Sequence, residues 1–121
     1  MKNTSILVVE DDSMTFESLK KILENLGYAN FSHVTNGMDA IAAAKLLNYE
    51  IILMDIGLEG KLDGIDTSAL LDGKSKVIFT SGNHKDGATF SRVAKTGGYG
   101  FISKPYTSQQ VREALENALK A

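Results

Sequence analysis

Four apolar stretches of this chain each end in polar side chains of a kind that binds metal ions or phosphoryl groups. Parallel strands have their carboxyl ends at one edge of a sheet, which is where open α/β sheets bind ligands. If the four stretches are such strands, carboxylates, a hydroxyl and a lysine meet in one small cleft. In chain order the polar groups are Glu10 and Asp11, Asp55, Thr80 and Ser81, and Lys104, which precedes the only proline, Pro105.

The carboxylates predict a site for a divalent metal ion. Two carboxylates about 4 Å apart repel each other by about 4 kcal/mol at an effective dielectric constant of about 20, and a hard cation removes that cost. A few carboxylates supplemented by water suit Mg²⁺, with Mn²⁺ as a substitute, better than the closed oxygen cage that Ca²⁺ requires. The acidic side chains expected to converge are those of Glu10, Asp11 and Asp55.

The lysine and the hydroxyl extend this prediction to phosphoryl chemistry. Lys104 offers a point positive charge for phosphoryl oxygens, and a Ser or Thr hydroxyl can donate to another oxygen. In-line attack on phosphorus by a carboxylate then gives an aspartyl phosphate. Any one of these polar groups alone would be interpreted as a solvated loop residue. Because such groups occur at the ends of four predicted strands, a functional site is favoured.

Strands and helices that alternate along the chain must position these groups. Apolar runs and helical spacing predict strands at 5–9, 30–34, 50–54, 76–80 and 99–103, and helices at 13–26, 38–47, 66–72, 86–96 and 108–120. Alternation implies right-handed crossovers and a parallel sheet. We therefore predict an α/β fold, a doubly wound three-layer α/β/α sandwich with five parallel strands in the order 2-1-3-4-5. That order places the first and third strands side by side at the switch point.

The composition is that of one small globular domain. The chain has 121 residues, 43% of them hydrophobic and 23% charged, which predicts a single domain over residues 1–121. It has no cysteine, so a disulfide or thiolate metal site is excluded. Its net charge of −2 gives no footprint for direct nucleic-acid binding. No apolar run approaches the roughly 20 residues of a membrane helix, so we expect a cytoplasmic protein without membrane contact.

Several segments, taken in order, resemble the receiver domains of two-component response regulators, in particular the single-domain chemotaxis-type regulators. These domains have a flavodoxin-like fold. The resemblance covers essentially the whole chain and rests on residues 6–12, 52–58, 63–65, 77–82 and 96–105.

The resemblance implies a role for each candidate residue. Asp55 is implied as the phosphoacceptor, and Lys104 as the residue that contacts the phosphoryl group. Asp11 and Asp55 would bind Mg²⁺ directly together with the backbone carbonyl of Gly57, and Glu10 would assist through water. The Lys104–Pro105 peptide bond would be cis. Asp12 is expected to cap the first helix rather than bind metal.

The sequence departs from the family pattern at the switch residues and in the third helix. Thr80 and Ser81 are adjacent, so the switch hydroxyl is ambiguous; counting along the strand favours Ser81, with Gly82 in the small-residue position after it. The aromatic switch position is Phe101, which lacks the hydroxyl often found there. The interval from Asp55 to Ser81 is also short, which predicts a stunted third helix.

Three functions are compatible with these residues. The leading interpretation is a phospho-accepting switch, not an enzyme beyond its own phosphotransfer and dephosphorylation. A phosphatase of the haloacid dehalogenase type is the rival, but it needs a second aspartate two residues after the nucleophile, where this chain has Gly57. The third is a degenerate receiver used only for binding, which would lack some of the acids or the lysine, whereas this chain keeps them all. A receiver domain that belongs to a hybrid histidine kinase is an alternative form of the leading interpretation.

The resemblance to receiver domains implies two kinds of partner, a phosphoryl donor and a downstream protein that receives the signal. The donor would be a histidine kinase or a histidine phosphotransfer protein. Since no output module is recognisable in the sequence, we expect the signal to pass to an unknown downstream protein. The surface expected to carry it is the one formed by residues 86–96, 99–103 and 108–120, with dimerisation upon phosphorylation as a further possibility of the family.

Overall fold

The protein is described by a computed structural model that covers residues 2–82 and 87–121, with side chains left out at 87–90. Five strands alternate with five helices: β1 (Ile6–Val9), α1 (Ser13–Asn25), β2 (Phe31–Val34), α2 (Gly37–Leu46), β3 (Ile51–Asp55), α3 (Gly64–Ala69), β4 (Lys76–Ser81), α4 (Gly87–Lys95), β5 (Gly100–Ser103) and α5 (Ser108–Lys120). Among these residues no helix has the length and apolar content to cross a bilayer.

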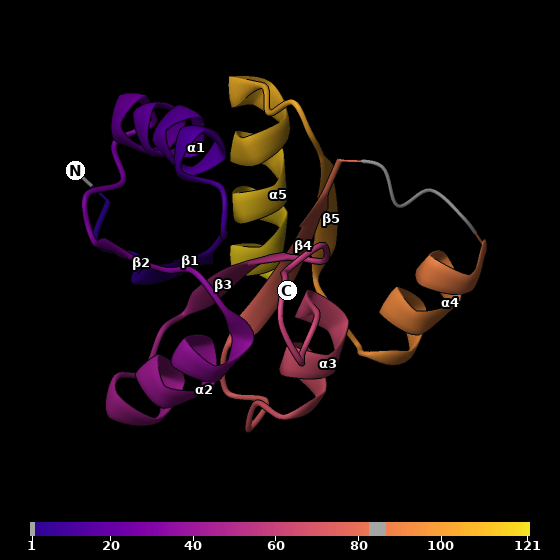
Figure 1. The fold of residues 1–121 in the computed structure, drawn as a ribbon. Helices are drawn as coiled ribbons and strands as arrows, with labels where there is room; N and C mark the ends of the chain where they lie inside the picture. The colour runs from indigo at the N-terminus through magenta and orange to yellow at the C-terminus, as the bar shows by residue number, and fades with distance from the viewer. Residues whose placement is uncertain (1, 83–86) are drawn as a thin grey trace.

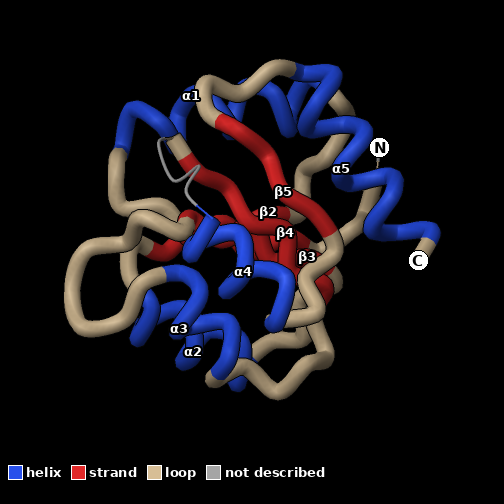
Figure 2. Tube along the Cα trace, turned by 90° about the vertical axis from the view of Figure 1, so that its right-hand side faces the viewer, coloured by secondary structure: helices blue, strands red, loops and turns tan. Residues whose placement is uncertain are grey.

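The sheet has the predicted topology. All strands are parallel, in the order β2-β1-β3-β4-β5, so β1 and β3 are neighbours. Helices α1 and α5 cover one face, and α2, α3 and α4 lie on the other (Figures 1 and 2). The doubly wound three-layer sandwich expected from the alternation of elements is therefore confirmed.

Alternate residues of the central strands fill two separate cores. Ile6, Leu53 and Ile78 pack with α1 and α5, whereas Leu7 and Met54 face the other helical layer. All of them are at most 1% exposed, and each such side chain contributes roughly 1.5–3 kcal/mol when fully buried. Burial on both faces explains why β1 and β3 are continuous apolar runs rather than alternating ones.

Side-chain caps set the helix starts. Asp12 accepts from the Thr15 backbone N–H at the start of α1, as predicted. Thr107 accepts from the Gln110 backbone N–H at the start of α5.

The third helix differs from its predicted range of 66–72. A capping box between Asp63 and Asp66 begins α3 at Gly64, and the helix ends at Ala69, three residues before the end of the predicted range. With six residues it is short, as the interval before Ser81 suggested. The fourth helix begins at Gly87, and residue 86 of its predicted range lies outside the described residues.

Candidate functional site

The candidate site lies at the carboxyl edge of the sheet. Asp55 is the last residue of β3 and Ser81 the last of β4, while Glu10 follows β1 directly and Lys104 follows β5. Backbone hydrogen bonds continue the ladder past the strand ends: the Glu10 N–H donates to the Val34 carbonyl at 3.1 Å, and the Lys104 N–H to the Ser81 carbonyl at 2.8 Å. Together with the β1–β3 and β3–β4 pairings, these bonds hold the four strand ends at one edge of the sheet.

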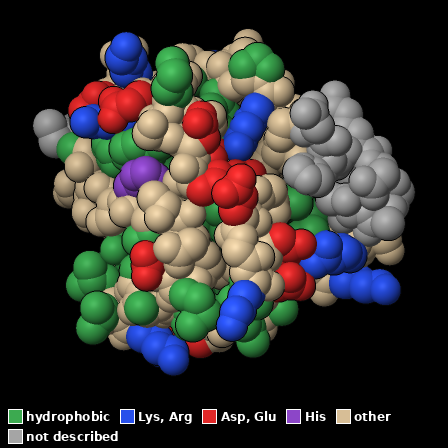
Figure 3. All heavy atoms as spheres, viewed as in Figure 1, with side chains coloured by type: hydrophobic (Ala, Val, Ile, Leu, Met, Phe, Trp, Pro, Cys, Tyr) green, Lys and Arg blue, Asp and Glu red, His purple; other side chains and the backbone are tan. Residues whose placement is uncertain are grey.

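Three acidic side chains converge at this edge. Glu10, Asp11 and Asp55 each offer a carboxylate oxygen, and these oxygens all lie within 4.8 Å of one another. Glu10 and Asp55 are 2% and 4% exposed, whereas Asp11 is open to solvent. Figure 3 shows acidic side chains gathered near the middle of the visible face, with a basic side chain beside them. The prediction that these acids meet at the switch point agrees with this geometry.

Glu10 is the most perturbed acid of the group. Its Oε2 accepts from the Asp12 backbone N–H at 3.2 Å, and its buried Oε1 lies 2.7 Å from the Lys104 ammonium. Burial raises the pKa of Glu10 from 4.5 to about 7, since the lowering by the Lys104 hydrogen bond is smaller and the Asp55 charge raises it further. Three carboxylates that share the positive charge of Lys104 leave an excess of negative charge, and a divalent metal ion fits that excess.

Lys104 supplies the positive charge at the site. Its Nζ lies 2.7 Å from Glu10 Oε1 and 3.3 Å from Asp55 Oδ1. Burial alone would lower the pKa of Lys104, but the hydrogen bond with Glu10 and the charges of Tyr106 and Asp55 outweigh it and leave the pKa raised. The residue is therefore a cation that faces two carboxylates. The peptide bond from Lys104 to Pro105 is cis.

The Asp55 carboxylate and backbone are both held in place. Its Oδ1 accepts from the Gly57 N–H at 3.0 Å. A Cβ atom on Gly64 would lie 2.0 Å from the Asp55 carbonyl oxygen, so only glycine allows the start of α3 to approach β3 this closely. The Gly57 carbonyl, an expected metal ligand, makes none of these contacts, and its role stays a prediction.

The two candidate switch hydroxyls have different surroundings. Thr80 and Ser81 are both buried, at 2% and 3% exposure. Thr80 lies opposite Asp55 in the β3–β4 register and shares a side-chain hydrogen bond with the hydroxyl of Tyr106. Ser81 lies one step further along β4, at the edge of the sheet. Phe101, the predicted aromatic switch residue, is half-buried and packs against the core on the α2–α3 side.

Sequence reasoning missed the role of Tyr106. Burial raises the pKa of the Tyr106 phenol to about 12, although the hydrogen bond with Thr80 acts in the opposite direction. The ring lines an open depression of about 420 Å³ between α1 and the segment after β5, together with Met14, Lys104 and Pro105. A polar aromatic residue two positions after the lysine was the available signal in the sequence.

Two further contacts around the acids were not predicted. His33, which the sequence presents as an isolated histidine, hydrogen-bonds through Nε2 to the Glu10 carbonyl at 2.7 Å and stacks on Phe16. Asp11 accepts from the Glu59 backbone N–H at 3.1 Å and thereby joins the loop after β3 to the acid cluster. Asp12 caps α1, as predicted, and lies outside the cluster.

The sheet and its acid–lysine edge define a doubly wound α/β domain with a candidate metal site, and the comparisons identify the family. Residues 6–116 match the response regulator receiver domain family, so the chain belongs to it. It is 30% identical over 117 residues to the chemotaxis protein CheY of Thermotoga maritima, with 95% of this chain and 97% of the relative covered.

Longer relatives carry the same domain. The transcriptional regulatory protein YvrH of Bacillus subtilis is 26% identical over 122 residues; 99% of this chain is matched, but it spans only about half (51%) of that relative's length. Among solved structures, the signal receiver domain of a modulated diguanylate cyclase from Desulfovibrio desulfuricans G20 superimposes with a TM-score of 0.88 at 33% identity, with 98% of this chain and 95% of the other covered.

Proposed function

We propose that this receiver domain is a phospho-accepting signalling switch in which Asp55 takes a phosphoryl group from a histidine kinase or a histidine phosphotransfer protein. The observation that carries the proposal is the Lys104 ammonium held 3.3 Å from Asp55 Oδ1, inside a group of three carboxylates in a chain of this family. A nucleophilic carboxylate beside a fixed cation is the arrangement that in-line phosphoryl transfer needs.

A magnesium ion fits the acid cluster. Asp11, Asp55 and the Gly57 carbonyl would hold it directly, and Glu10 would hold it through water. When bound, the metal supplies charge neutralisation for the incoming phosphoryl group. Lys104 would then exchange its contact with Asp55 for one with a phosphoryl oxygen, while its contact with Glu10 keeps the ammonium in place.

Ser81 is the proposed switch hydroxyl. Thr80 lies opposite Asp55 in the β3–β4 register, one residue before the end of β4. Ser81 is the last residue of β4, where a hydroxyl can follow a phosphoryl group on Asp55. Its movement would bias the rotamer of Phe101 in the adjacent strand, so that a local charge change acquires a two-state readout.

Partners would meet the domain on two different sides. The donor reaches Asp55 and Lys104 from the open depression lined by Met14, Pro105 and Tyr106. The output uses the face formed by α4, β5 and α5, for a downstream protein or for a second copy of the domain upon phosphorylation. The segment that links Ser81 to this face, at 82–87, lies largely outside the described residues. Residues 1–121 act as one domain in the cytoplasm.

The competing functions are less well supported. A phosphatase of the haloacid dehalogenase type lacks its general acid, because Gly57 occupies that position, and the family match points elsewhere. A receiver that is part of a hybrid histidine kinase uses the same site chemistry, so it would differ from the leading proposal in its parent chain and not in the role of Asp55.

The position of the phosphoryl group tests the proposal. After incubation with Mg²⁺ and a small phosphodonor, we expect peptide mapping to place the group on Asp55. Asp12→Asn, which alters an acid outside the cluster, serves as the matched control and should keep the label. A label that survives Asp55→Asn at full stoichiometry, without transfer to a neighbouring acid, would refute the assignment.

A further inference from the structure

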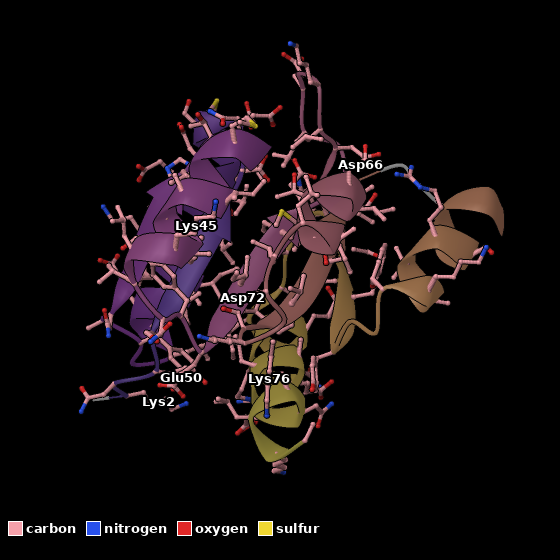
Figure 4. All side chains as sticks on the ribbon, turned by 90° about the horizontal axis from the view of Figure 1, so that it is seen from below. Lys2, Lys45, Glu50, Asp66, Asp72 and Lys76 are labelled. Carbon is pink, nitrogen blue, oxygen red and sulfur yellow. The ribbon has the colours of Figure 1, made fainter. Side chains whose placement is uncertain are left out.

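Arg92 of α4 forms an ion-pair network with the beginning of α3. Its Nη1 lies 3.0 Å from Asp63 Oδ2, and its Nη2 lies 3.0 Å from Asp66 Oδ1 and 3.3 Å from Asp63 Oδ1. The planar guanidinium thus holds Asp63 with two nitrogens and reaches Asp66 as well, which is a geometry that lysine cannot reproduce. Figure 4 shows Asp66 on the side of α3 that faces α4.

Both acids also fix the start of α3. Asp63 is the N-cap and accepts from the Asp66 backbone N–H at 2.8 Å, while the Asp66 carboxylate accepts from the Asp63 N–H at 3.4 Å. Burial would raise the pKa of Asp63, but the Asp66 backbone hydrogen bond and Arg92 outweigh it and hold that pKa below its usual value. Asp63 is therefore charged, and the capping hydrogen bonds fix the orientation of both carboxylates, so the network has a rigid anchor on the α3 side.

The same segment abuts the phosphoacceptor. The Gly64 N–H donates to the Ile56 carbonyl at 3.1 Å, and the absence of a side chain on Gly64 lets it press against the Asp55 carbonyl. A displacement of residues 63–66 is therefore transmitted to the end of β3. Arg92 joins this segment to α4, the helix that follows the Ser81 strand end and belongs to the proposed output face.

Few other described contacts hold α4. Val93 packs against the core as a partly buried residue, and Figure 1 shows the helix standing to one side of the sheet. Arg92 itself is about half exposed, with 45% of its side chain accessible. A half-exposed ion-pair network of this kind can bias the position of α4 and can also be broken when α4 moves.

We propose that Arg92 is a regulatory latch that holds α4 against the start of α3 in the unmodified protein and thereby opposes phosphorylation of Asp55. The effect on phosphorylation rests on the proposed function; the restraint on α4 does not. A contact that forms in only one of two conformations shifts the conformational equilibrium toward that conformation. If the position of α4 affects phosphorylation of Asp55, phosphorylation must affect the position of α4 to the same extent. Releasing the latch must then favour the phosphoryl-accepting arrangement.

Matched variants isolate the network. Arg92→Gln removes its charge, Arg92→Lys keeps the charge without the planar fork, and Asp66→Asn keeps an acceptor for the Asp63 N–H while removing one acid. Lys95→Gln is the control, since it removes a positive charge from the last turn of the same helix and no ion pair of Lys95 occurs among the described residues.

Two measurements on the full chain decide the proposal. Arg92→Gln and Asp66→Asn should each speed amide exchange at 91–95 in the unmodified protein and raise the initial rate of phosphorylation by acetyl phosphate about two- to five-fold, the range for an exposed ion pair. The double variant should gain no more than Arg92→Gln alone, because that substitution already removes the ion pairs with both Asp63 and Asp66. Arg92→Lys should give exchange and phosphorylation rates between those of the wild type and Arg92→Gln, and Lys95→Gln should give the rates of the wild type. Added salt should reduce the differences in rate between the variants and the wild type.

Contrary outcomes are distinct. Unchanged exchange at 91–95 in Arg92→Gln would show that the network does not restrain α4. Faster exchange with an unchanged or slower phosphorylation rate would show that the contact does not oppose phosphorylation, and either result overturns the latch. Failure of the wild type to accept a phosphoryl group at all would overturn the proposed function and the regulatory role with it, while the exchange data would still report on the restraint.

Discussion

Replacing Glu10 by glutamine should stabilise the metal-free protein at alkaline pH. Glu10 is 2% exposed, and burial raises its pKa from 4.5 to about 7. A carboxyl group whose pKa is higher in the folded state binds protons more tightly there, so its contribution to stability is greatest below pH 4.5 and is lost as the pH rises to about 7. The rise corresponds to about 3 kcal/mol, an upper value for the gain in Glu10→Gln above pH 7.

An opposing effect makes this prediction informative. The substitution also removes the ion pair with Lys104, and breaking a buried pair typically costs about 3–5 kcal/mol when the partner is left alone. Here Lys104 keeps Asp55 at 3.3 Å, so the ammonium retains a partner. We therefore expect relief of the buried charge to exceed the loss of the pair.

Urea denaturation in the presence of a chelator provides the assay. The free energies of unfolding of wild type and Glu10→Gln should differ little at pH 4.5, and above pH 7 the variant should be more stable by about 1–3 kcal/mol. Added Mg²⁺ should narrow that gap, because it stabilises the wild type more. A variant that is less stable than the wild type at pH 8 would refute the reasoning and show that the Lys104 pair dominates.

The remaining predictions concern the metal, the switch and the start of α3. Mg²⁺ at one hundred times its dissociation constant should add about 2.7 kcal/mol to the stability of the wild type; Asp11→Asn should lose most of the thermal shift, and equal shifts would exclude Asp11 as a ligand. Ser81→Ala should still accept a phosphoryl group but show a smaller change in amide exchange over 91–103; if Thr80→Ala shows that behaviour instead, the switch is Thr80. Gly64→Ala should destabilise the fold by roughly 1–3 kcal/mol or more, because its methyl group would meet the Asp55 carbonyl; urea denaturation with an unchanged midpoint would show that α3 can retreat without cost.

The strand order and the acid cluster follow from patterns that are local in sequence. Each buried strand is an apolar run that ends in a polar residue, and alternation with helices leaves few arrangements of a parallel sheet. The proximity of Asp55 and Glu10 could therefore be predicted from the sequence alone. The third helix was placed too late because the capping box formed by Asp63 and Asp66, which sets its beginning at Gly64, was not recognised in the sequence.

Side-chain partners across the fold could not be predicted in the same way. The contact of Arg92 with Asp63 depends on where α4 lies relative to α3, which no periodicity encodes. The hydrogen bond between Tyr106 and Thr80 likewise depends on how the segment after β5 passes over β4. Both arise from tertiary packing, and sequence reasoning supplies only the residue types that make them possible.

The most direct test of the central claim is intact-mass measurement after incubation with a small phosphodonor. The account predicts that the wild type gains the mass of one phosphoryl group when Mg²⁺ is present, gains little when a chelator is present, and that Asp55→Asn gains none under either condition. A wild type that stays unmodified with Mg²⁺, or an Asp55→Asn variant that is modified as fully as the wild type, would contradict it.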